Sequence, residues 1–460
     1  MTRDYGTRDY GTRDFESFDC PVSRSPASHS QIEIHMIETI YQHFQKAYKV
    51  STDSRKIEKD AVFFALKGEN FDANDFALQV AEQGLASLVV ADRKDLPKHE
   101  RILIVDDSLK ALQDLAAYHR QQSKAIVLSI TGTNGKTTTK ELVSAVLAKK
   151  YNIIHTMGNL NNHIGVPLTL LNIKPETEIA VVEMGANHPG EIDFLCRIAD
   201  PDYGLITNIG KAHLEGFGSF EGVIKTKTEL YRHIKANGKA VFVNQGNPLL
   251  WEQSEGQERI SYGRHCAAFC PVAPAACNPY LSVGWREHLI QTHLVGSYNF
   301  ENVAAAIGVG QYFEVDENAI IEALEAYTPT NSRSQVIETS KNRIIMDAYN
   351  ANPTSMRAAL INFASICGDN SLLVLGDMRE LGTASEEEHR NILGLMKELK
   401  FKEALLVGSN FSAYNENPDW KTFDNVQSLC QYLESNPISG KTILVKGSHS
   451  VQLEKVLPLL

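Results

Sequence analysis

Residues 131–138 read Thr131-Gly132-Thr133-Asn134-Gly135-Lys136-Thr137-Thr138, directly after the apolar run 125–130 and before a helical pattern. Glycines at such a point let the backbone turn so that consecutive amides face phosphate oxygens, and the helix start adds partial positive charge. Lys136 can then reach terminal phosphates, and Thr137 can hold Mg²⁺. The glycines are closer together than in the common nucleotide loop, and a plain strand-to-helix turn is the alternative that the flanking pattern disfavours. The residues expected to bind a nucleotide here are Gly132, Thr133, Asn134, Gly135, Lys136, Thr137 and Thr138.

Short apolar runs alternate with helical patterns on both sides of this loop. The runs that predict strands before the last third of the chain are 61–66, 88–90, 102–105, 179–183, 204–208 and 240–244. In the last third the predicted order is strand 343–347, helix 355–366, strand 372–375, helix 386–399, and strands 404–407 and 442–445. The alternation predicts an α/β protein with three domains. These are a small α/β domain at 37–112, a central domain with a mostly parallel sheet at 113–330, and a doubly wound, Rossmann-like domain at 331–460.

Residues 1–36 differ from the rest of the chain. They begin with a near-tandem repeat, in which Thr-Arg-Asp-Tyr-Gly occurs twice before Thr-Arg-Asp-Phe, and continue with a Ser- and Pro-rich run. Such a composition offers little apolar surface to bury. Met36 opens the first periodic apolar pattern, so we expect residues 1–36 to form a disordered tail.

The composition disfavours several classes of protein. The 460 residues are 43% hydrophobic and 22% charged, as in ordinary globular proteins. A net charge of −11 provides no overall basic field for nucleic acid. No apolar stretch reaches the roughly 18 residues that a membrane span needs, and the polar N-terminus lacks the apolar core of a secretion signal. We therefore expect a cytoplasmic protein with neither a nucleic acid nor a membrane as partner.

The seven cysteines are an odd number without a CxxC pair, which predicts reduced thiols rather than a disulfide framework. His265, Cys266, Cys270 and Cys277 lie close together in the sequence and suggest a zinc site as an alternative. Their spacing fits no usual structural zinc pattern. We prefer to interpret this segment as a variable loop with free thiols.

Several polar positions need a wider context before a role can be given. Glu183 ends a predicted strand, where parallel sheets place ligands, but an acid at a strand end is also ordinary. His213 follows the next strand, and a lone histidine is more often structural. Lys225 and Lys227 lie in a probable helix, where such a pair usually forms a solvated face. Asn302 opens a helix of small residues and could contact a nucleotide or cap the helix.

The loop Thr-Gly-Thr-Asn-Gly-Lys-Thr closely resembles the ATP loop of the Mur ligases and their folylpolyglutamate synthase relatives. The resemblance spans 37–460 through separated motifs, among which are 52–55, 158–167, 207–216, 347–353 and 376–382. It implies an ATP-dependent amide ligase. The motifs Asn-Leu-Asn-Asn, Ala-Tyr-Asn-Ala-Asn-Pro and Gly-Asp-Met favour the member that adds D-alanyl-D-alanine to UDP-N-acetylmuramoyl-tripeptide in peptidoglycan synthesis, through an acyl phosphate.

The resemblance also implies catalytic and metal-binding roles. Lys136 would contact the transferring phosphates, and Thr137, Glu183 and His213 would bind Mg²⁺. Lys227 matches the family lysine that reacts with CO₂ to become a carbamate, an anionic metal ligand, and Lys225 is the competing candidate. The reaction requires the neutral amine and therefore a lowered lysine pKa.

Binding residues follow from the same resemblance. Those expected to contact ATP, besides the loop, are Asn302, Arg333, Asp347 and Asn350. Those expected to contact the UDP-linked substrate are Ser54 and Arg55 for UDP, and Asn159, Asn161 and Asn162 for the muramoyl peptide. The chain departs from the family pattern where Tyr298 replaces a usual histidine, where His449 replaces a usual arginine, and where Met346 shortens an acidic pair.

Rival interpretations are the ligase that adds the third peptide residue, a folylpolyglutamate synthase, and a non-catalytic nucleotide-binding regulator. The three motifs that favour D-alanyl-D-alanine addition disfavour the first two. Retention of Lys136, Glu183, His213 and Lys227 together disfavours the third. We expect a monomer, and the sequence leaves open whether the third residue of the peptide substrate is meso-diaminopimelate or lysine.

Overall fold

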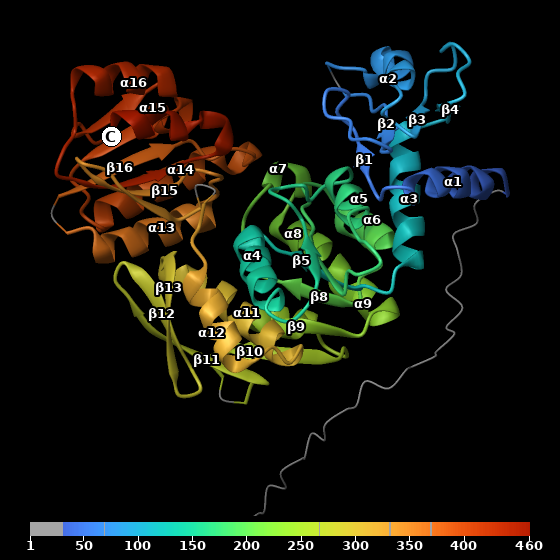
Figure 1. Ribbon diagram of the computed structural model, residues 1–460. Coiled ribbons are helices and arrows are strands. Elements are labelled where there is room, and N and C mark those ends of the chain that lie inside the picture. Colours follow the sequence, from blue (N-terminus) through green and yellow to red (C-terminus); the bar gives the residue numbers. More distant parts are fainter. Residues whose placement is uncertain (1–30, 69, 266, 331–332, 369) are drawn as a thin grey trace, which may run out of the picture.

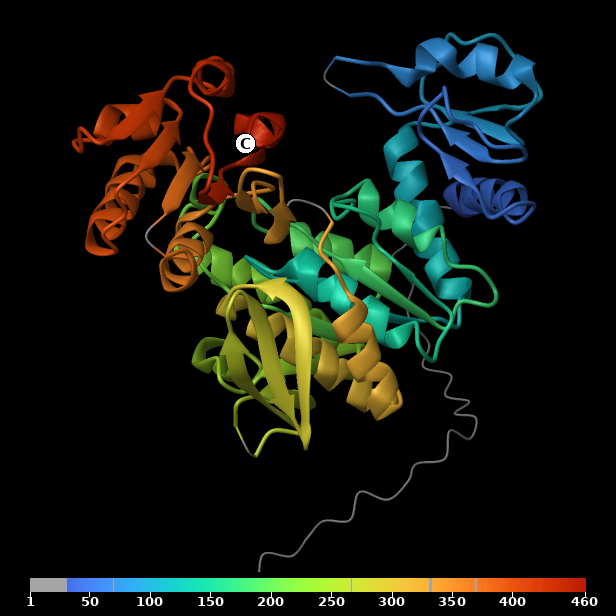
Figure 2. The same ribbon diagram turned by 60° about the vertical axis from the view of Figure 1, so that its left-hand side comes forward.

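Three sheets with mostly parallel strands form the frame of the molecule (Figure 1). The computed structural model describes residues 31–68, 70–265, 267–330, 333–368 and 370–460. The sheets have four, nine and six strands in chain order. In both ribbon views the N-terminal and C-terminal sheets stand on the same side of the central one (Figures 1 and 2). The expected three-domain α/β fold is confirmed.

The N-terminal domain is a four-stranded parallel sheet with the order β1-β2-β3-β4. Its strands are β1 (Val50–Ser51), β2 (Val62–Phe64), β3 (Leu88–Ala91) and β4 (Ile102–Ile104). Its helices are α1 (Gln31–Phe44), the short η1 (Ala73–Phe76), α2 (Ala77–Gln83) and α3 (Ser108–Gln122). β2 and β3 are buried throughout, as the apolar runs predict.

Helix α1 already includes Gln31, the first described residue, and so extends upstream of Met36, which corrects the expected boundary of the tail. The apolar pattern marks only where buried side chains such as Ile37, Ile40 and Phe44 begin, whereas backbone hydrogen bonding continues the helix upstream of them. The rest of the expected tail, residues 1–30, lies outside the described residues.

Helix α3 joins the N-terminal domain to the central one. Leu112 and Leu115 of α3 share an apolar core with Phe44 of α1 and with Val166 of the central domain. Buried Arg120 donates to Asp202 of the central domain at 2.8 Å. Because this helix packs on both sides, the sequence-based boundary at residue 112 falls within an element that belongs to both domains.

The central sheet has the order β13-β12-β11-β10-β9-β8-β5-β7-β6. Its strands are β5 (Ile126–Thr131), β6 (Ile153–His155), β7 (Ile179–Glu183), β8 (Tyr203–Ile206), β9 (Ala240–Asn244), β10 (Arg259–Gly263), β11 (Cys270–Cys277), β12 (Tyr280–Trp285) and β13 (His288–Val295). Its helices are α4 (Lys136–Leu147), α5 (Gly165–Leu170), α6 (Glu191–Ala199), α7 (Leu214–Phe217), α8 (Phe220–Lys227), α9 (Glu229–Asn237), α10 (Pro248–Gln253), η2 (Ser297–Asn299), α11 (Phe300–Tyr312) and α12 (Glu317–Ala326). The strands from β6 to β11 pair in parallel, as expected.

The antiparallel ribbon β11-β12-β13 extends the parallel part of this sheet and was not predicted. The segment with Cys270 and Cys277, interpreted from the sequence as a variable loop, is strand β11, which corrects that interpretation. Prolines and alanines in β11 give it a weak strand propensity, and its partners supply the pairing. Among the residues that the structure describes, no three His, Cys, Asp or Glu side chains form a metal cluster, and Cys266 lies outside them.

The C-terminal sheet has the order β14-β15-β19-β16-β17-β18, in which β14 and β15 pair antiparallel and the other neighbouring strands pair in parallel. Its strands are β14 (Gln335–Glu338), β15 (Arg343–Asp347), β16 (Ser371–Gly376), β17 (Ala404–Val407), β18 (Trp420–Phe423) and β19 (Thr442–Lys446). Its helices are α13 (Pro353–Ile366), η3 (Gly382–Ala384), α14 (Ser385–Glu398), α15 (Ser409–Tyr414), α16 (Val426–Ser435), η4 (His449–Val451) and η5 (Leu453–Leu459). Separate apolar cores cover its two faces, as in a doubly wound domain.

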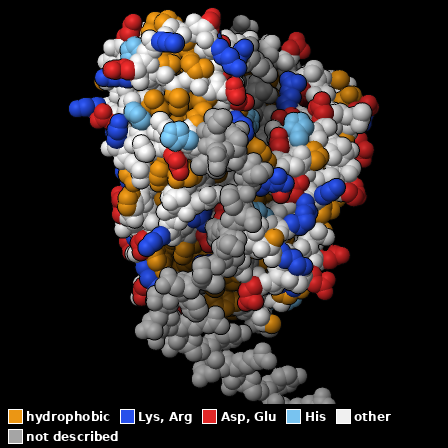
Figure 3. Space-filling view, turned by 90° about the vertical axis from the view of Figure 1, so that its right-hand side faces the viewer, with side chains coloured by type: hydrophobic (Ala, Val, Ile, Leu, Met, Phe, Trp, Pro, Cys, Tyr) orange, Lys and Arg blue, Asp and Glu red, His pale blue; other side chains and the backbone are white. Residues whose placement is uncertain are grey.

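The surface agrees with the overall charge. On the face in Figure 3, acidic and basic side chains alternate, and the visible part has no extended basic stripe. Within the described parts of the chain, no helix has both the length and the apolar character needed to cross a membrane.

Candidate active site

A cleft of about 1260 Å³ lies between the central and C-terminal domains. Its lining combines the phosphate loop, residues after β7 and β8, and residues at the carboxyl end of β15. The expected site residues in this lining are Thr133, Asn134, Gly135, Lys136, Thr137, Thr138, Asn159, Asn161, Asn162, Glu183, His213, Asn302, Arg333, Asp347 and Asn350. The tertiary structure therefore brings most of the expected nucleotide and peptide contacts into one cleft.

The two glycines of the phosphate loop lie where a side chain would be strained and crowded. Gly132 has φ 144°, and a Cβ there would lie 2.0 Å from Oγ1 of Thr207. Gly135 has φ 78° at the start of α4, and a Cβ there would lie 2.5 Å from Oδ1 of Asn302. A side chain at either position would meet both a strained backbone and a neighbouring side chain, so glycine is strongly favoured there.

Lys136 folds back over the loop that precedes it. Its Nζ donates to the carbonyl oxygens of Gly132 at 2.9 Å and Thr133 at 3.1 Å. Burial lowers the pKa of this ammonium, and nearby Glu183 opposes that shift. The contacts place a cation at the loop where phosphates would meet the N-terminus of α4.

Glu183 forms the buried centre of a small polar group. Oγ1 of Thr137 donates to its Oε1 at 3.1 Å, and Nδ2 of Asn161 donates to the same atom at 2.7 Å. Its Oε2 is buried and has no hydrogen-bond partner among the described residues. An orphaned carboxylate oxygen beside a threonine hydroxyl fits Mg²⁺, which prefers oxygen ligands.

His213 lies at the start of α7 with a left-handed backbone, φ 50°. Its Nδ1 contacts the carboxylate of Glu380, which belongs to the C-terminal domain. Its ring also meets Phe217 edge-to-face. His213 therefore lines the cleft and is contacted by a residue of the C-terminal domain.

The two candidate lysines of α8 differ in environment. Lys225 is exposed, whereas Lys227 is 2% exposed. Nζ of Lys227 lies 3.4 Å from the carbonyl oxygen of Ala186 and 5.5 Å from the ring centre of Phe217. Burial, followed by repulsion from Lys136, lowers its pKa well below the usual value. Ala186 belongs to the cleft lining, whereas Lys227 does not.

The C-terminal domain meets the phosphate loop directly. Nδ2 of Asn352 donates to Oδ1 of Asn134 at 2.8 Å across the domain boundary. The guanidinium of Arg333 lies 3.6 Å from the ring centre of Tyr349, and its buried Nε has no hydrogen-bond partner among the described residues. This unpaired donor in the cleft is suited to an anionic ligand.

Other residues expected to contact ATP already form hydrogen bonds to neighbouring protein groups. Asp347 accepts from Nζ of Lys446 at 2.6 Å, and this lysine also reaches the carbonyl oxygen of Asn350 at 3.3 Å. Oδ1 of Asn302 accepts from the hydroxyl of Thr139 at 3.0 Å. This hydrogen bond joins α11 to α4, against which it packs. These side chains border the cleft but also maintain its shape.

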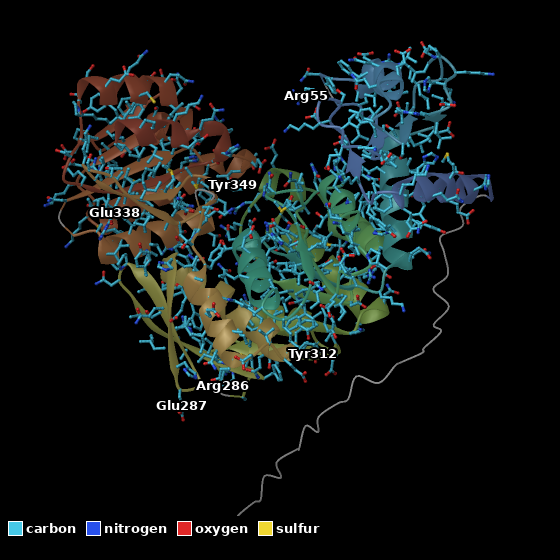
Figure 4. The ribbon with its side chains drawn as sticks, in the orientation of Figure 1. Arg55, Arg286, Glu287, Tyr312, Glu338 and Tyr349 are labelled. Atoms are coloured by element: carbon cyan, nitrogen blue, oxygen red, sulfur yellow. The ribbon has the colours of Figure 1, made fainter. Side chains whose placement is uncertain are left out.

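Ser54 and Arg55 lie apart from the cleft, in a cavity of about 320 Å³ in the N-terminal domain. Arg55 is exposed and pairs with Asp53 at 2.8 Å. In Figure 4 Arg55 is on the side of its domain that faces the C-terminal domain, where Tyr349 is labelled. Ser54 and Arg55 thus lie in the N-terminal domain, whereas the other predicted binding residues lie in or beside the main cleft.

Sequence reasoning gave no separate role to Asn352 or Glu380, although both lie in motifs that it singled out. The sequence likewise gave no individual role to His188, Arg264 or Lys446, which line the cleft. His188 and Lys446 come after predicted strands, which does not reveal a contact between domains, and no predicted element precedes Arg264 closely.

A phosphate loop, a buried carboxylate and a cleft closed by a Rossmann-like domain define a nucleotide-dependent α/β enzyme. Three domain families match the chain: the Mur ligase family catalytic domain at 46–120, the Mur ligase middle domain at 130–310, and the Mur ligase glutamate ligase domain at 332–449. The chain belongs to the Mur ligase family.

Relatives and solved structures agree with this membership. The chain is 36% identical over 423 residues to UDP-N-acetylmuramoyl-tripeptide--D-alanyl-D-alanine ligase of Bacillus subtilis, covering 89% of this chain and 92% of the relative. The Escherichia coli enzyme of the same name is 36% identical over 429 residues, with the same coverage of each chain. The crystal structure of MurF from Acinetobacter baumannii has a TM-score of 0.80 at 31% identity, with 91% of this chain and 97% of that chain covered. MurF ligase from Thermotoga maritima in complex with ADP has a TM-score of 0.77 at 27% identity, with 89% and 96% covered.

Proposed function

We infer that this protein is an ATP-dependent amide ligase that joins D-alanyl-D-alanine to UDP-N-acetylmuramoyl-tripeptide, a step of peptidoglycan precursor synthesis. The observation that carries this inference is the similarity, over 89% of the chain, to ligases named for that reaction. The cleft adds a physical basis, since it joins a phosphate loop to a second domain that can bring an acceptor to the nucleotide.

In the proposed mechanism the amides at the start of α4 and the ammonium of Lys136 orient the γ-phosphoryl group of ATP. The terminal carboxylate of the tripeptide attacks this phosphorus, which gives ADP and an acyl phosphate. The amine of D-alanyl-D-alanine then attacks the carbonyl carbon, and phosphate leaves. Lys136 contributes by placing positive charge where negative charge accumulates, and the cleft contributes by holding the reacting groups together.

We propose that Thr137, Glu183 and His213 bind Mg²⁺, with Lys227 as a carbamate. Mg²⁺ would supply neutralisation of the phosphate charge. The orphaned Oε2 of Glu183 supports this assignment. The burial of Lys227 favours the neutral amine that carbamate formation needs, whereas exposed Lys225 lacks that environment.

For the UDP-linked substrate we propose Ser54 and Arg55 as contacts of UDP, and Asn159, Asn161 and Asn162 as contacts of the muramoyl peptide. We propose Asn302, Arg333, Asp347 and Asn350 as ATP contacts. The cavity beside Arg55 and the asparagines in the main cleft lie on different domains, which suits a long substrate that spans both. We further propose that the enzyme acts in the cytoplasm as a monomer.

An acceptor panel tests the function against its rivals. The purified enzyme with ATP and Mg²⁺ is given UDP-N-acetylmuramoyl-tripeptide with D-alanyl-D-alanine, the corresponding dipeptide with meso-diaminopimelate or lysine, or a folate with glutamate. We expect product by mass spectrometry only in the first reaction. Equal turnover with folate and glutamate, or addition of a third peptide residue, would refute the proposed reaction.

A further inference from the structure

The loop that follows β16 carries Glu380 from the C-terminal domain to His213 of the central domain. Both residues have left-handed backbones, with φ 62° at Glu380 and φ 50° at His213. Non-glycine residues seldom adopt this conformation, and surrounding structure must maintain it. Two strained residues that meet across a domain boundary point to a required contact.

The backbone before Glu380 is fixed at every position. Buried Asp377 accepts from the amides of Asn410 and Phe411, each at 3.0 Å. The amide of Met378 donates to Nε2 of buried His389 at 3.1 Å, and the amide of Arg379 donates to Oγ of Ser448 at 3.0 Å. Three successive residues are therefore anchored in the C-terminal core, so that Glu380 is presented from a rigid support.

A second ion pair crosses the boundary nearby. Lys211 donates to Glu388 of α14 at 3.0 Å. Gly382 of η3 also approaches the side chain of Glu215, where an added Cβ would lie 3.4 Å away. These contacts show that the segment 211–215 docks against 380–388, and they provide a comparison for the His213–Glu380 pair.

The ring nitrogen of His213 that Glu380 contacts indicates what this pair could do. The carboxylate of Glu380 contacts Nδ1, although that nitrogen has no well-aligned hydrogen-bond partner among the described residues, so Nε2 is the ring nitrogen that Glu380 leaves uncovered. Histidines that bind metals commonly donate their other ring N–H to a carboxylate, which fixes the tautomer and the orientation of the ring. The contact thus leaves Nε2 as the atom available for ligation.

We propose that Glu380 is a positioning residue for the metal site: its carboxylate orients His213 for ligation through Nε2. This inference rests on the proposed role of His213 in binding Mg²⁺. Because Glu380 comes from the C-terminal domain, the metal site is complete only when that domain is docked on the central one. Glu380 therefore acts on the metal site through His213, without direct ligation.

The test measures metal binding without turnover. The full chain, in bicarbonate buffer, is titrated with Mn²⁺ alone, and free Mn²⁺ is followed by electron paramagnetic resonance. We expect Glu380→Gln to weaken Mn²⁺ binding by about 10-fold, as for other carboxylates behind metal-bound histidines. Glu388→Gln is the matched control, because it removes the neighbouring interdomain ion pair, and we expect less than about a two-fold change if orientation of His213 is what matters. In a His213→Ala background, Glu380→Gln should have no further effect.

The outcomes separate this inference from the proposed metal site. If His213→Ala weakens Mn²⁺ binding but Glu380→Gln does not, Glu380 has no positioning role, and the metal assignment stands. Equal weakening by Glu388→Gln would overturn the inference in favour of general domain docking. If His213→Ala itself leaves Mn²⁺ affinity unchanged, the proposed metal role of His213 fails. A changed KM for D-alanyl-D-alanine in Glu380→Gln, with normal Mn²⁺ affinity, would instead make Glu380 a substrate contact.

Discussion

At the phosphate loop, Lys136 is positioned by two carbonyl oxygens of its own loop, at 2.9 and 3.1 Å. We expect Lys136→Ala to lower the rate of phosphate release by about a hundred-fold or more, since removal of one preorganised group at a developing charge has effects of this size. The melting temperature should change little, because the side chain anchors no core element. A near-normal rate in this variant would refute its role.

The two lysines of α8 permit a matched comparison. We expect Lys227→Ala to lose most activity and to be partly restored by acetate or formate, which can supply the missing anionic oxygen. Lys225→Ala should lose much less and show no rescue, because that side chain is exposed. Rates are measured with and without the added carboxylate. Rescue at Lys225 instead would place the carbamate there, and rescue at neither would leave mass detection of a carbamate to decide.

Among individual residues, the sequence predicted those that act together within one short segment, but not the contacts between residues of different domains. The glycines, Lys136 and Thr137 are neighbours in the chain, so their spacing predicts the loop. Glu380 is far from His213 in sequence, and only the tertiary structure joins them. The sequence favoured Lys227 over Lys225 by motif register alone, and the structure adds that Lys227 is buried whereas Lys225 is exposed.

Among the elements, helix α13 begins with a capping box that also serves the cleft. Oδ1 of Asn352 accepts from the amide of Ser355 at 2.9 Å, while its Nδ2 donates to Asn134 at 2.8 Å. We expect Asn352→Ala to destabilise the helix start by about 1 kcal/mol, the usual value of such a cap. Hydrogen exchange of the first turn of α13 should then be about five-fold faster.

The matched variant is Asn352→Asp, which preserves a capping oxygen but cannot donate to Asn134. Exchange in α13 should stay near that of the unmodified protein, whereas ligase activity should fall in both variants because both lose the interdomain hydrogen bond. Faster exchange in the aspartate variant, or unchanged activity in the alanine variant, would contradict this division of roles.

The elements that the sequence predicted best are those with a strong apolar signal. Strands such as β7 and β16 are buried almost throughout, so their runs are continuous. The ribbon β11-β12-β13 was missed although Leu281, Val283 and Trp285 alternate with more exposed residues along β12. Its first strand is rich in alanine and proline, and pairing with neighbours rather than local propensity determines it.

For the molecule as a whole, the sequence predicts that residues before the first helix are dispensable, because their composition offers little to bury. Since α1 includes residues from Gln31 on, the appropriate shortened chain begins there rather than at Met36. We expect that chain to keep the melting temperature and ligase activity of the full one. Loss of either quantity would show that residues 1–30 contribute to stability or catalysis.

The most direct test of the proposed ligase activity is phosphate release by the full chain in a complete reaction and in reactions that each omit one component. With ATP, Mg²⁺, UDP-N-acetylmuramoyl-tripeptide and D-alanyl-D-alanine all present, one phosphate should appear for each UDP-N-acetylmuramoyl-pentapeptide formed. Omission of any one component should abolish sustained release, because the acyl phosphate and the attacking amine are both required for turnover. Sustained phosphate release without the tripeptide or without D-alanyl-D-alanine, or no pentapeptide in the complete reaction, would contradict the proposed function.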